Sequence, residues 1–323
     1  MRVVVYGAGA IGGVMGAELF ASGHDVVLIA RGEHGRVIAE EGLQYVTAEK
    51  TVTLTVPVVP HPSEIAFTDD DVVVLGMKSQ HTPDALEELW ATAGCRVPVF
   101  CAQNGVENER LALRRFDHVY GMCAQGWATH LAPGVVVGNS APARGLYQLG
   151  RYPDGSDDRA ERLAAALNVS GFVATVHEDV MAYKHAKLLG NLRNISQALF
   201  VPDDVDAVAA LAFAEGTAAL RAAGIPHVER QAFRAMLDPE VIHRVTIEGF
   251  PAVVTSTWQS LARGATSTET DYLNGEVALL GRLYGVPTPA NVLLQQMARE
   301  AVQRGLRPAT LTRRDFFDRL AAC

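Results

Sequence analysis

A glycine-rich turn near the N-terminus constrains the fold of this chain more than any other feature of its sequence. Residues 7–12 read Gly-Ala-Gly-Ala-Ile-Gly, which fits the pattern G-x-G-x-x-G. The turn follows an apolar, β-branched segment at 3–6 and opens a helical pattern at 11–21, and a second strand pattern follows at 25–30. A glycine turn that joins a strand to a helix in this order predicts a βαβ unit of the Rossmann type.

Each glycine of the turn has a physical role in binding a dinucleotide. Gly7 allows the tight turn, Gly9 lets the backbone approach a pyrophosphate, and Gly12 lets the helix pack closely on the strand. The phosphates then lie at the helix N-terminus, where unpaired N–H groups and the positive end of the helix dipole point outward. The residues that we expect at the cofactor are Gly7, Ala8, Gly9, Ala10, Ile11 and Gly12. The alternative is a glycine-rich turn without a ligand.

The end of the second predicted strand indicates which nicotinamide dinucleotide the turn binds. NAD enzymes place an acidic residue about 20 residues after the turn, where it binds the 2′-hydroxyl of the ribose. Here the strand ends in Arg31, whose guanidinium matches a phosphate in charge and geometry. Arg31 therefore favours NADP, although Glu33 weighs against it. A surface arginine without a ligand is the alternative.

The N-terminal half continues this alternation of strands and helices. Apolar runs at 72–76 and 97–101 predict strands, with a helical pattern at 83–92 between them, and such alternation predicts a parallel sheet. Segments 44–46 and 51–56 predict an inserted hairpin. Further elements are expected as antiparallel strands at 134–137 and 146–149, a helix at 159–166 and a strand at 172–176.

The C-terminal half has a different pattern, because strand signals nearly vanish after Glu178. Long alanine- and leucine-rich helical patterns follow at 180–200, 205–223 and 271–284. A chain of 323 residues is long enough for two domains, because single cores usually stop growing before that length. We therefore predict an α/β protein with a doubly wound, N-terminal Rossmann sheet at 1–178 and an all-helical C-terminal domain at 179–323.

Composition and charge exclude several classes of protein. Apolar residues make up 49% of the chain and charged residues 20%, a balance that argues against disorder. The formal charge of −8 and the lack of Lys/Arg runs argue against nucleic acid as a partner. No segment is apolar over the length of a membrane helix, no signal peptide precedes the first strand, and four cysteines without CxxC spacing predict no metal site. We expect a cytoplasmic protein with a small-molecule substrate, and the sequence leaves a homodimer open.

Two further loops are expected at the same edge of the sheet, because ligands bind outside the carboxyl ends of the strands in doubly wound sheets. Lys78 follows one predicted strand and could pair with a cofactor phosphate. Asn104 follows another and could hydrogen-bond the nicotinamide or the substrate, with Gly105 allowing a tight turn. The alternatives are a solvated lysine and an ordinary Asn-Gly turn.

The helical pattern at 180–200 places Lys187, Asn191 and Asn194 in one polar stripe. The stripe lies beside the apolar face rather than opposite it, so it could border a cleft. A lysine there could protonate a carbonyl oxygen, because partial burial lowers the pKa of a lysine from about 10.4 toward roughly 7–8. A solvated helix face is the alternative.

Two polar residues of the last third complete the set of candidates. Ser256 lies in the stretch 255–259, and Glu269 lies near the predicted start of a helix. Glu269 could accept a hydrogen bond from a substrate hydroxyl or tune the lysine. The pattern Thr266-x-x-Glu269 is also typical of a capping box, in which the acid bonds a backbone N–H.

Taken in order, these motifs resemble those of the ketopantoate reductase (2-dehydropantoate 2-reductase) family. The likeness covers nearly the whole chain. It includes the GAGAIG turn, the arginine that ends the second strand, the MK loop, the QNG loop, the K-x-x-x-N helix, the S-x-W-Q stretch and the final E-x-D-Y-x-N-G. Each motif is common alone, but the ordered set is specific.

The resemblance implies a Rossmann domain joined to a helical domain, with the active site in the cleft between them. It implies that NADPH reduces the C2 ketone of ketopantoate to pantoate, for pantothenate synthesis. The glycine turn, Arg31 and Lys78 would hold the cofactor, and Asn104 would lie between nicotinamide and substrate. Lys187 would be the general acid. The residues that would position the substrate are Asn191, Asn194, Ser256 and Glu269.

The chain departs from the family pattern at four places. Ile195 and Val253 stand where the family has asparagines, and Tyr183 or a nearby residue replaces a tryptophan that the family has near the lysine. One residue is also inserted between Gln259 and Glu269. These changes affect the expected contacts to the substrate carboxylate. Two alternatives stay open: an NADPH-dependent reductase of a different 2-oxo acid or ketone in secondary metabolism, and an NADP-binding regulator without turnover.

Overall fold

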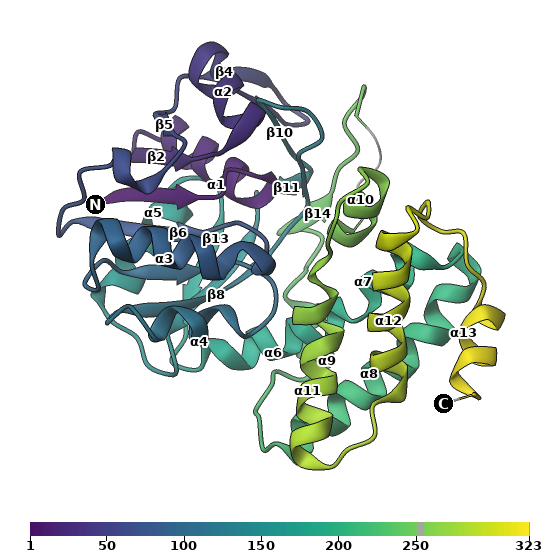
Figure 1. The fold of residues 1–323 in the computed structure, drawn as a ribbon. Coiled ribbons are helices and arrows are strands. Elements are labelled where there is room, and N and C mark those ends of the chain that lie inside the picture. The colour runs from purple at the N-terminus through teal and green to yellow at the C-terminus, as the bar shows by residue number, and fades with distance from the viewer. Residues whose placement is uncertain (251–254, 323) are drawn as a thin grey trace. The chain divides into compact units, whose positions relative to one another are not determined.

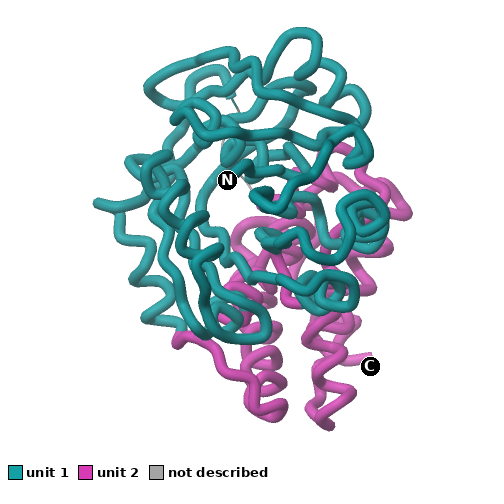
Figure 2. The backbone as a smooth tube through the Cα atoms, turned by 90° about the vertical axis from the view of Figure 1, so that its left-hand side faces the viewer, with its two compact units in different colours: residues 1–103, 107–184, 230–253 teal, residues 104–106, 185–229, 254–323 magenta. Residues whose placement is uncertain are grey.

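The computed structural model describes residues 1–250 and 255–322, and the chain divides into two compact units (Figures 1 and 2). The first unit comprises residues 1–103, 107–184 and 230–253, and the second comprises residues 104–106, 185–229 and 254–323. The first unit thus extends beyond the predicted boundary at residue 178. It also includes a later segment that the sequence pattern assigned to the helical domain.

The first unit is built on an eight-stranded sheet with the strand order β13-β12-β8-β7-β6-β1-β2-β5. Its strands are β1 (Arg2–Tyr6), β2 (Asp25–Ile29), β5 (Val58–Val59), β6 (Asp71–Leu75), β7 (Val99–Cys101), β8 (Val119–Gln125), β12 (Leu146–Arg151) and β13 (Val173–Val176). All neighbours from β8 to β5 in this order are parallel, whereas β12 is antiparallel to β8. The predicted Rossmann sheet is confirmed. Because β1 lies between β2 and β6, the strand order reverses there, which makes its carboxyl end a topological switch point.

The residues of β1 explain why helices cover both faces of this sheet. Val3 and Val5 belong to one apolar core, which includes residues of α1 and α5, and Val4 and Tyr6 belong to another, which includes residues of α3 and α4. Since successive side chains of a strand point to opposite faces, a strand that is apolar throughout needs cover on both sides. The helices of this unit are α1 (Ala10–Ala21), α2 (Gly32–Glu41), α3 (Thr82–Ala93), α4 (Asn108–Leu113), α5 (Asp158–Val169) and α9 (Arg230–Ala235).

Two smaller sheets extend the first unit. The four-stranded sheet has the order β4-β3-β10-β9. Its strands are β3 (Leu43–Val46), β4 (Thr51–Leu54), β9 (Ala128–Thr129) and β10 (Val135–Gly138). The pairing of β3 with β4 is the predicted hairpin, and β10 is antiparallel to β9 but parallel to β3. A two-stranded sheet pairs β11 (Ser140–Pro142) with β14 (Ile242–Arg244), a strand that the sequence pattern does not predict.

The second unit is formed by helices in its described residues, as predicted. The prediction of one helix over 180–200 is wrong, however, because α6 (Val180–Asn191) ends before Leu192 and a new helix begins at Arg193. The apolar core of the unit contains Leu192 and Ile195. Its helices after α6 are α7 (Arg193–Leu199), α8 (Val205–Ala222), α10 (Ser256–Ala262), α11 (Asn274–Tyr284), α12 (Pro289–Gln303) and α13 (Arg313–Leu320), with short 3₁₀ helices η3 (Pro202–Asp204) and η4 (Glu269–Tyr272). Over the ranges that are described, no helix is long and apolar enough to cross a bilayer.

Candidate active site

The glycine turn has the geometry that a bound pyrophosphate requires. Gly7 has a φ of +103°, and a Cβ atom on it would lie 2.5 Å from the backbone nitrogen of Met77. A Cβ on Gly12 would lie 2.2 Å from the carbonyl oxygen of Gly7, so α1 packs directly on the turn. A Cβ on Gly9, in contrast, would meet no atom within 4 Å. The two outer glycines are thus required by close packing, while the backbone at the middle glycine is open to a ligand.

The start of α1 is suited to an anion. Gly9 is the N-cap residue, no side chain caps the helix, and the first turn carries no acidic residue. The backbone N–H groups at this end therefore have no side-chain acceptor, and the positive end of the helix dipole is not offset by a nearby carboxylate. Ala8 is buried, and Ala10 and Ile11 are half-buried at the helix start. Figure 1 shows α1 directly after β1.

His34, which sequence reasoning missed, supports the glycine turn from α2. Its Nδ1 accepts a hydrogen bond of 2.9 Å from the backbone N–H of Gly134. Nε2 is therefore the protonated nitrogen, and it donates to the carbonyl oxygen of Ala8 at 2.7 Å. Burial and the neighbouring ring of His130 lower the pKa of His34, which keeps the ring neutral. No local pattern reveals this role, because the contact to Gly134 spans 100 residues.

Arg31 lies at the end of β2, where it is the N-cap residue of α2 and half-exposed. Glu33, which weighed against an NADP site, pairs with Arg36 at 2.6 Å instead. Burial lowers the pKa of His81, and the charges of Arg31 and Lys78 lower it further. Arg31 follows β2, and Lys78 and His81 follow β6, so the three basic residues come from the ends of the two strands that flank β1. Such a group fits a phosphate.

Lys78 follows β6 and precedes the 3₁₀ helix η2 (Ser79–His81). Since β6 is parallel to β1 with Leu75 opposite Tyr6, both strands end at the same level of the sheet. The loop after β6 therefore lies beside the glycine turn, which agrees with the close approach of Met77 to Gly7.

A buried hydrogen-bond network joins the loops that follow β6 and β7. The Gln103 amide donates to the Thr82 hydroxyl at 2.8 Å, and Thr82 donates to the Asn108 side chain at 2.8 Å. Asn108, which is fully buried, donates to the Ser79 hydroxyl at 3.1 Å. The network stabilises the backbone directly after Lys78 and directly before Asn104. Sequence reasoning missed it, because its members look like ordinary loop polar residues.

The short segment Asn104–Val106 groups with the second unit. Gly105 has a φ of +80°, and a Cβ on it would lie 3.0 Å from the carbonyl oxygen of Tyr272 at the end of η4. Glu269, the first residue of η4, is 7% exposed. The loop that carries Asn104 therefore packs against the turn that carries Glu269.

The capping box predicted for Glu269 is wrong. The N-cap residue of η4 is Thr268, and its side chain makes no capping hydrogen bond. Glu269 is thus the first residue of the helix rather than the third, and Thr266 lies two residues before the N-cap. The burial of this carboxylate is not explained by a capping role.

Lys187 and Asn191 lie in the last two turns of α6, and both are half-buried. The Nδ2 atom of Asn191 is buried and has no hydrogen-bond partner in the part of the chain that the structure describes. A buried amide without a partner costs free energy, so this side chain fits a role in holding a ligand. Asn194 is half-buried in α7, beyond the break between the helices, so the three residues do not form the predicted continuous stripe.

Asn274 supports the break between α6 and α7. Its Nδ2 atom donates to the carbonyl oxygen of Leu192 at 3.5 Å and to the side chain of Asn291 at 3.0 Å. Asn291 in turn donates to Glu215 at 2.8 Å, and all these groups are inside the second unit. Asn274, which precedes Gly275 in the E-x-D-Y-x-N-G motif, thus stabilises the backbone next to Asn191.

Ser256 is the exposed first residue of α10, where its carbonyl oxygen accepts a hydrogen bond of 2.8 Å from Ser260. Thr255 is the N-cap residue and accepts from the backbone of Trp258 at 3.4 Å. Val253, where the family pattern has an asparagine, lies outside the described residues. The other departure, Ile195, is buried in the core of the second unit.

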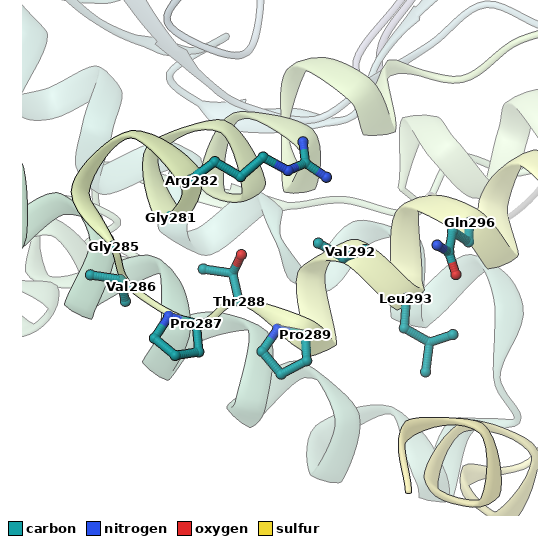
Figure 3. Close-up of a pocket in the computed structure, with 10 residues that line it drawn as sticks. All are labelled: Gly281, Arg282, Gly285, Val286, Pro287, Thr288, Pro289, Val292, Leu293 and Gln296. Carbon is teal, nitrogen blue, oxygen red and sulfur yellow. The ribbon is translucent and has the colours of Figure 1, made fainter. Parts of the chain in front are cut away.

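One apolar pocket in the second unit does not involve these residues. It has a volume of about 480 Å³ and lies at the connection between α11 and α12 (Figure 3). Its lining consists of Gly281, Arg282, Gly285, Val286, Pro287, Thr288, Pro289, Val292, Leu293 and Gln296. Since no candidate residue lines it, the pocket is separate from the proposed chemistry.

Comparison with protein families gives two matches that cover most of the chain. Residues 3–153 match the family described as ketopantoate reductase PanE/ApbA, and residues 179–302 match its C-terminal family. The 2-dehydropantoate 2-reductase of Mesorhizobium japonicum is 30% identical, with 94% of this chain and 99% of the relative covered. The enzyme of the same name from Pyrococcus horikoshii is 28% identical, with 91% and 95% covered.

Solved structures share the fold. A PanE/ApbA family ketopantoate reductase from Ralstonia eutropha JMP134 has a TM-score of 0.78 and 27% identity, with 94% of this chain and 99% of that chain covered. A D-mandelate dehydrogenase solved with NADH and anilino(oxo)acetate has a TM-score of 0.76 and 24% identity, with the same coverage. At that identity the second likeness shows the fold alone.

Proposed function

The chain belongs to the ketopantoate reductase family, and from this premise we propose that it reduces the C2 ketone of 2-dehydropantoate to pantoate with NADPH. The chain is thus an oxidoreductase of a family that acts on carbonyl and alcohol groups with a nicotinamide cofactor. The observation that carries the finer proposal is the site at the switch point. There the open glycine backbone after β1 is flanked by basic residues that follow β2 and β6, namely Arg31, Lys78 and His81.

The residues of the first unit fit a phosphorylated dinucleotide. The turn from Gly7 to Gly12 would hold the pyrophosphate at the N-terminus of α1, because a Cβ at Gly9 is the only one of the three that would meet open space. Arg31 and Lys78 would hold the 2′-phosphate, since a guanidinium and an ammonium both donate to phosphate oxygens. When bound, the reduced nicotinamide supplies a hydride to the carbonyl carbon of the substrate.

Lys187 is proposed as the proton donor to the carbonyl oxygen, which becomes the C2 hydroxyl. One proton from its ammonium group balances the reaction, and solvent then restores that proton. Its place suits this role, because Lys187 is half-buried on α6, one helical turn before Asn191.

The other residues of the second unit are proposed to orient the substrate. Asn191 has a buried amide without a partner, and Glu269 has a buried carboxylate that could accept from a substrate hydroxyl. Asn104 is proposed between nicotinamide and substrate, because its loop packs against the turn that carries Glu269. Asn194 and Ser256 are proposed as weaker contacts, since one lies beyond a helix break and the other is exposed.

A steady-state assay with 2-dehydropantoate tests this proposal. The protein should oxidise NADPH on addition of 2-dehydropantoate, and a parallel series with NADH gives the preference for each cofactor. Tight binding of NADPH without turnover of any carbonyl substrate would instead favour an NADP-binding regulator.

A different 2-oxo acid or ketone is the second candidate for the substrate. Its support is Ile195, which takes the place of a family asparagine and is only 1% exposed, so that the chain has no polar group there to bind a carboxylate. A panel of 2-oxo acids, compared by kcat/KM, separates the two candidates. A tenfold or greater advantage for another acid over 2-dehydropantoate would favour the second.

A further inference from the structure

We propose that Glu88, on α3, is a specificity-determining residue that weakens the preference for NADPH over NADH. The inference rests on the proposed function, because it concerns the same cofactor site. Its basis is the position of the Glu88 carboxylate between the end of β1 and the end of β2. Tyr6, the last residue of β1, and Arg31, two residues after β2, are its partners there.

Tyr6 fixes the carboxylate at the switch point. It is the last residue of β1, directly before the glycine turn, and it is buried. Its hydroxyl donates a hydrogen bond to Oε2 of Glu88. Burial and this hydrogen bond raise the pKa of Tyr6, so the hydroxyl stays protonated and remains a donor. Glu88 is therefore held in place by a side chain of the central strand.

The carboxylate also lies near Arg31. Oε1 of Glu88 is 3.9 Å from the Arg31 guanidinium, while His61 lies 3.7 Å from Oε2. Many NAD enzymes have an acid at the end of the second strand, and here that position holds Arg31. Glu88 brings a carboxylate to the same place from a different element. The site thus combines the arginine of NADP enzymes with the acid of NAD enzymes.

The two oxygens of Glu88 have different partners, and this difference gives the carboxylate its proposed role. Oε2 accepts from Tyr6, whereas the one partner of Oε1 among the described residues is Arg31, at 3.9 Å, which is longer than a hydrogen bond. Oε1 can therefore accept from the 2′-hydroxyl of NADH. A 2′-phosphate is largely doubly ionised at neutral pH, so it is a poor donor to a carboxylate. It also carries the same sign of charge, so Glu88 opposes it while Arg31 attracts it.

The variant Glu88→Gln tests this inference, because an amide keeps an acceptor for Tyr6 but removes the charge. The dissociation constants of NADPH and NADH are measured for the full chain by nucleotide fluorescence, and kcat/KM is measured for both. We expect the NADPH/NADH ratio to rise about tenfold in both measurements, with NADPH bound more tightly. Because both cofactors are compared on one protein preparation, a change in the folded fraction cancels in the ratio.

Glu87→Gln is the matched control. Glu87 is the preceding residue of α3, is exposed and pairs with Arg115 at 2.8 Å, so the substitution makes the same change of net charge away from the site. The NADPH/NADH ratio of Glu87→Gln should stay within twofold of the wild-type ratio. An unchanged ratio in Glu88→Gln, or an equal rise in Glu87→Gln, overturns the inference while the proposed function stands. A wild-type protein that binds neither nucleotide overturns both.

Discussion

A Cβ atom on Gly105 would lie 3.0 Å from the carbonyl oxygen of Tyr272. This close approach joins two loops of the second unit that are far apart in sequence, one with Asn104 and the other with Glu269. Both are in the group of residues for which we propose contacts with substrate and nicotinamide. A small substitution that changes the spacing between these two loops should therefore change the rate of catalysis.

Gly105→Ala should lower kcat by tenfold or more, because a methyl group at 3.0 Å from backbone would displace the loop, and small displacements of positioned groups are costly in rate. Steady-state kinetics with 2-dehydropantoate measures the effect. The affinity for NADPH should change less than kcat, since the residues proposed to hold its phosphates belong to the first unit.

Gly94→Ala separates the effect of the contact from that of the backbone strain. Gly94 has a φ of +71°, similar to the +80° of Gly105, but a Cβ there would meet no atom within 4 Å. Both variants should lose about 1–3 kcal/mol of stability, because glycine adopts these backbone conformations without strain and alanine does not. An equal loss of kcat in both would show that the contact with Tyr272 has no role.

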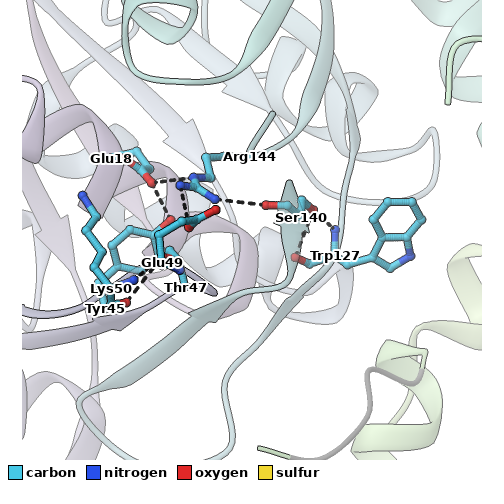
Figure 4. A network of polar contacts seen from close by, with 8 residues as sticks. All are labelled: Glu18, Tyr45, Thr47, Glu49, Lys50, Trp127, Ser140 and Arg144. Carbon is cyan, nitrogen blue, oxygen red and sulfur yellow. Dashed lines mark hydrogen bonds and ion pairs between the residues drawn. The ribbon is translucent and has the colours of Figure 1, made fainter. Parts of the chain in front are cut away.

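Arg144 should be important for the stability of the first unit. Its Nε donates to Glu18 of α1 at 3.1 Å, and Tyr45 donates to the same carboxylate at 2.6 Å (Figure 4). Glu18 is buried, so Arg144→Met would leave its charge without a compensating cation. We expect a loss of about 3 kcal/mol in chemical denaturation, against about 1 kcal/mol for Tyr45→Phe, which removes one hydrogen bond.

Arg162→Met is the control for this network. Arg162 forms an ion pair of 2.7 Å with Asp70, but both side chains are more than half exposed. Exposed pairs contribute about 0–1 kcal/mol, so the variant should be nearly neutral. Similar losses in Arg144→Met and Arg162→Met would contradict the importance of burial.

His34 should make the first unit less stable in mild acid. Its pKa is lowered in the folded protein, mainly by burial, so the neutral ring favours folding. The contribution is complete above the ordinary histidine pKa of about 6.5 and is lost as the pH falls through the lowered value. His34→Gln retains a donor and an acceptor but does not titrate, so its unfolding free energy should fall less between pH 7.5 and pH 5.

His243 is exposed, so the variant His243→Gln is the control for His34→Gln. His243→Gln should keep the pH dependence of the wild type. If His34→Gln also keeps it, the protonation of His34 does not control stability in this range.

Asn191 should contribute to substrate binding at a cost in stability. Its amide is buried without a partner, so Asn191→Leu should leave the free energy of unfolding unchanged or raise it by about 1 kcal/mol. The KM for 2-dehydropantoate should rise at least tenfold. Denaturation and steady-state kinetics on the same preparation check both effects.

Asn168→Leu should behave in the opposite way. Asn168 pairs with the backbone N–H and the carbonyl oxygen of Ala174 at 2.8 and 2.9 Å, so its removal should lower stability without raising KM. A loss of stability in Asn191→Leu as large as in Asn168→Leu would show that Asn191 is a structural residue.

The sequence predicted the parts of the fold that depend on local patterns. The strand before Gly7 is apolar at every position and needs helices on both faces, and this requirement leads to the doubly wound sheet. The special geometry of Gly7 and Gly12 could also be predicted, because only glycine fits such close packing. The hairpin of β3 and β4 followed from two short β-branched segments.

Long-range contacts account for most of what local patterns did not predict. The break at Leu192 falls inside an unbroken helical pattern, and its carbonyl oxygen accepts a hydrogen bond from Asn274, 82 residues later. Likewise β14 forms only because it pairs with β11. Glu88 lies in an ordinary helical pattern, and its partner Tyr6 lies 82 residues earlier. Such contacts depend on the assembled sheet, which no segment shows alone.

Single-turnover reduction of 2-dehydropantoate by the wild type and by Lys187→Ala decides whether Lys187 is the proton donor. We expect the wild type to oxidise NADPH in the presence of this ketone. We also expect the variant to bind NADPH with unchanged affinity but to turn over at least 100-fold more slowly, because it lacks the proton donor. Equal rates in the two proteins, or no oxidation by the wild type despite tight binding of NADPH, would contradict this proposal.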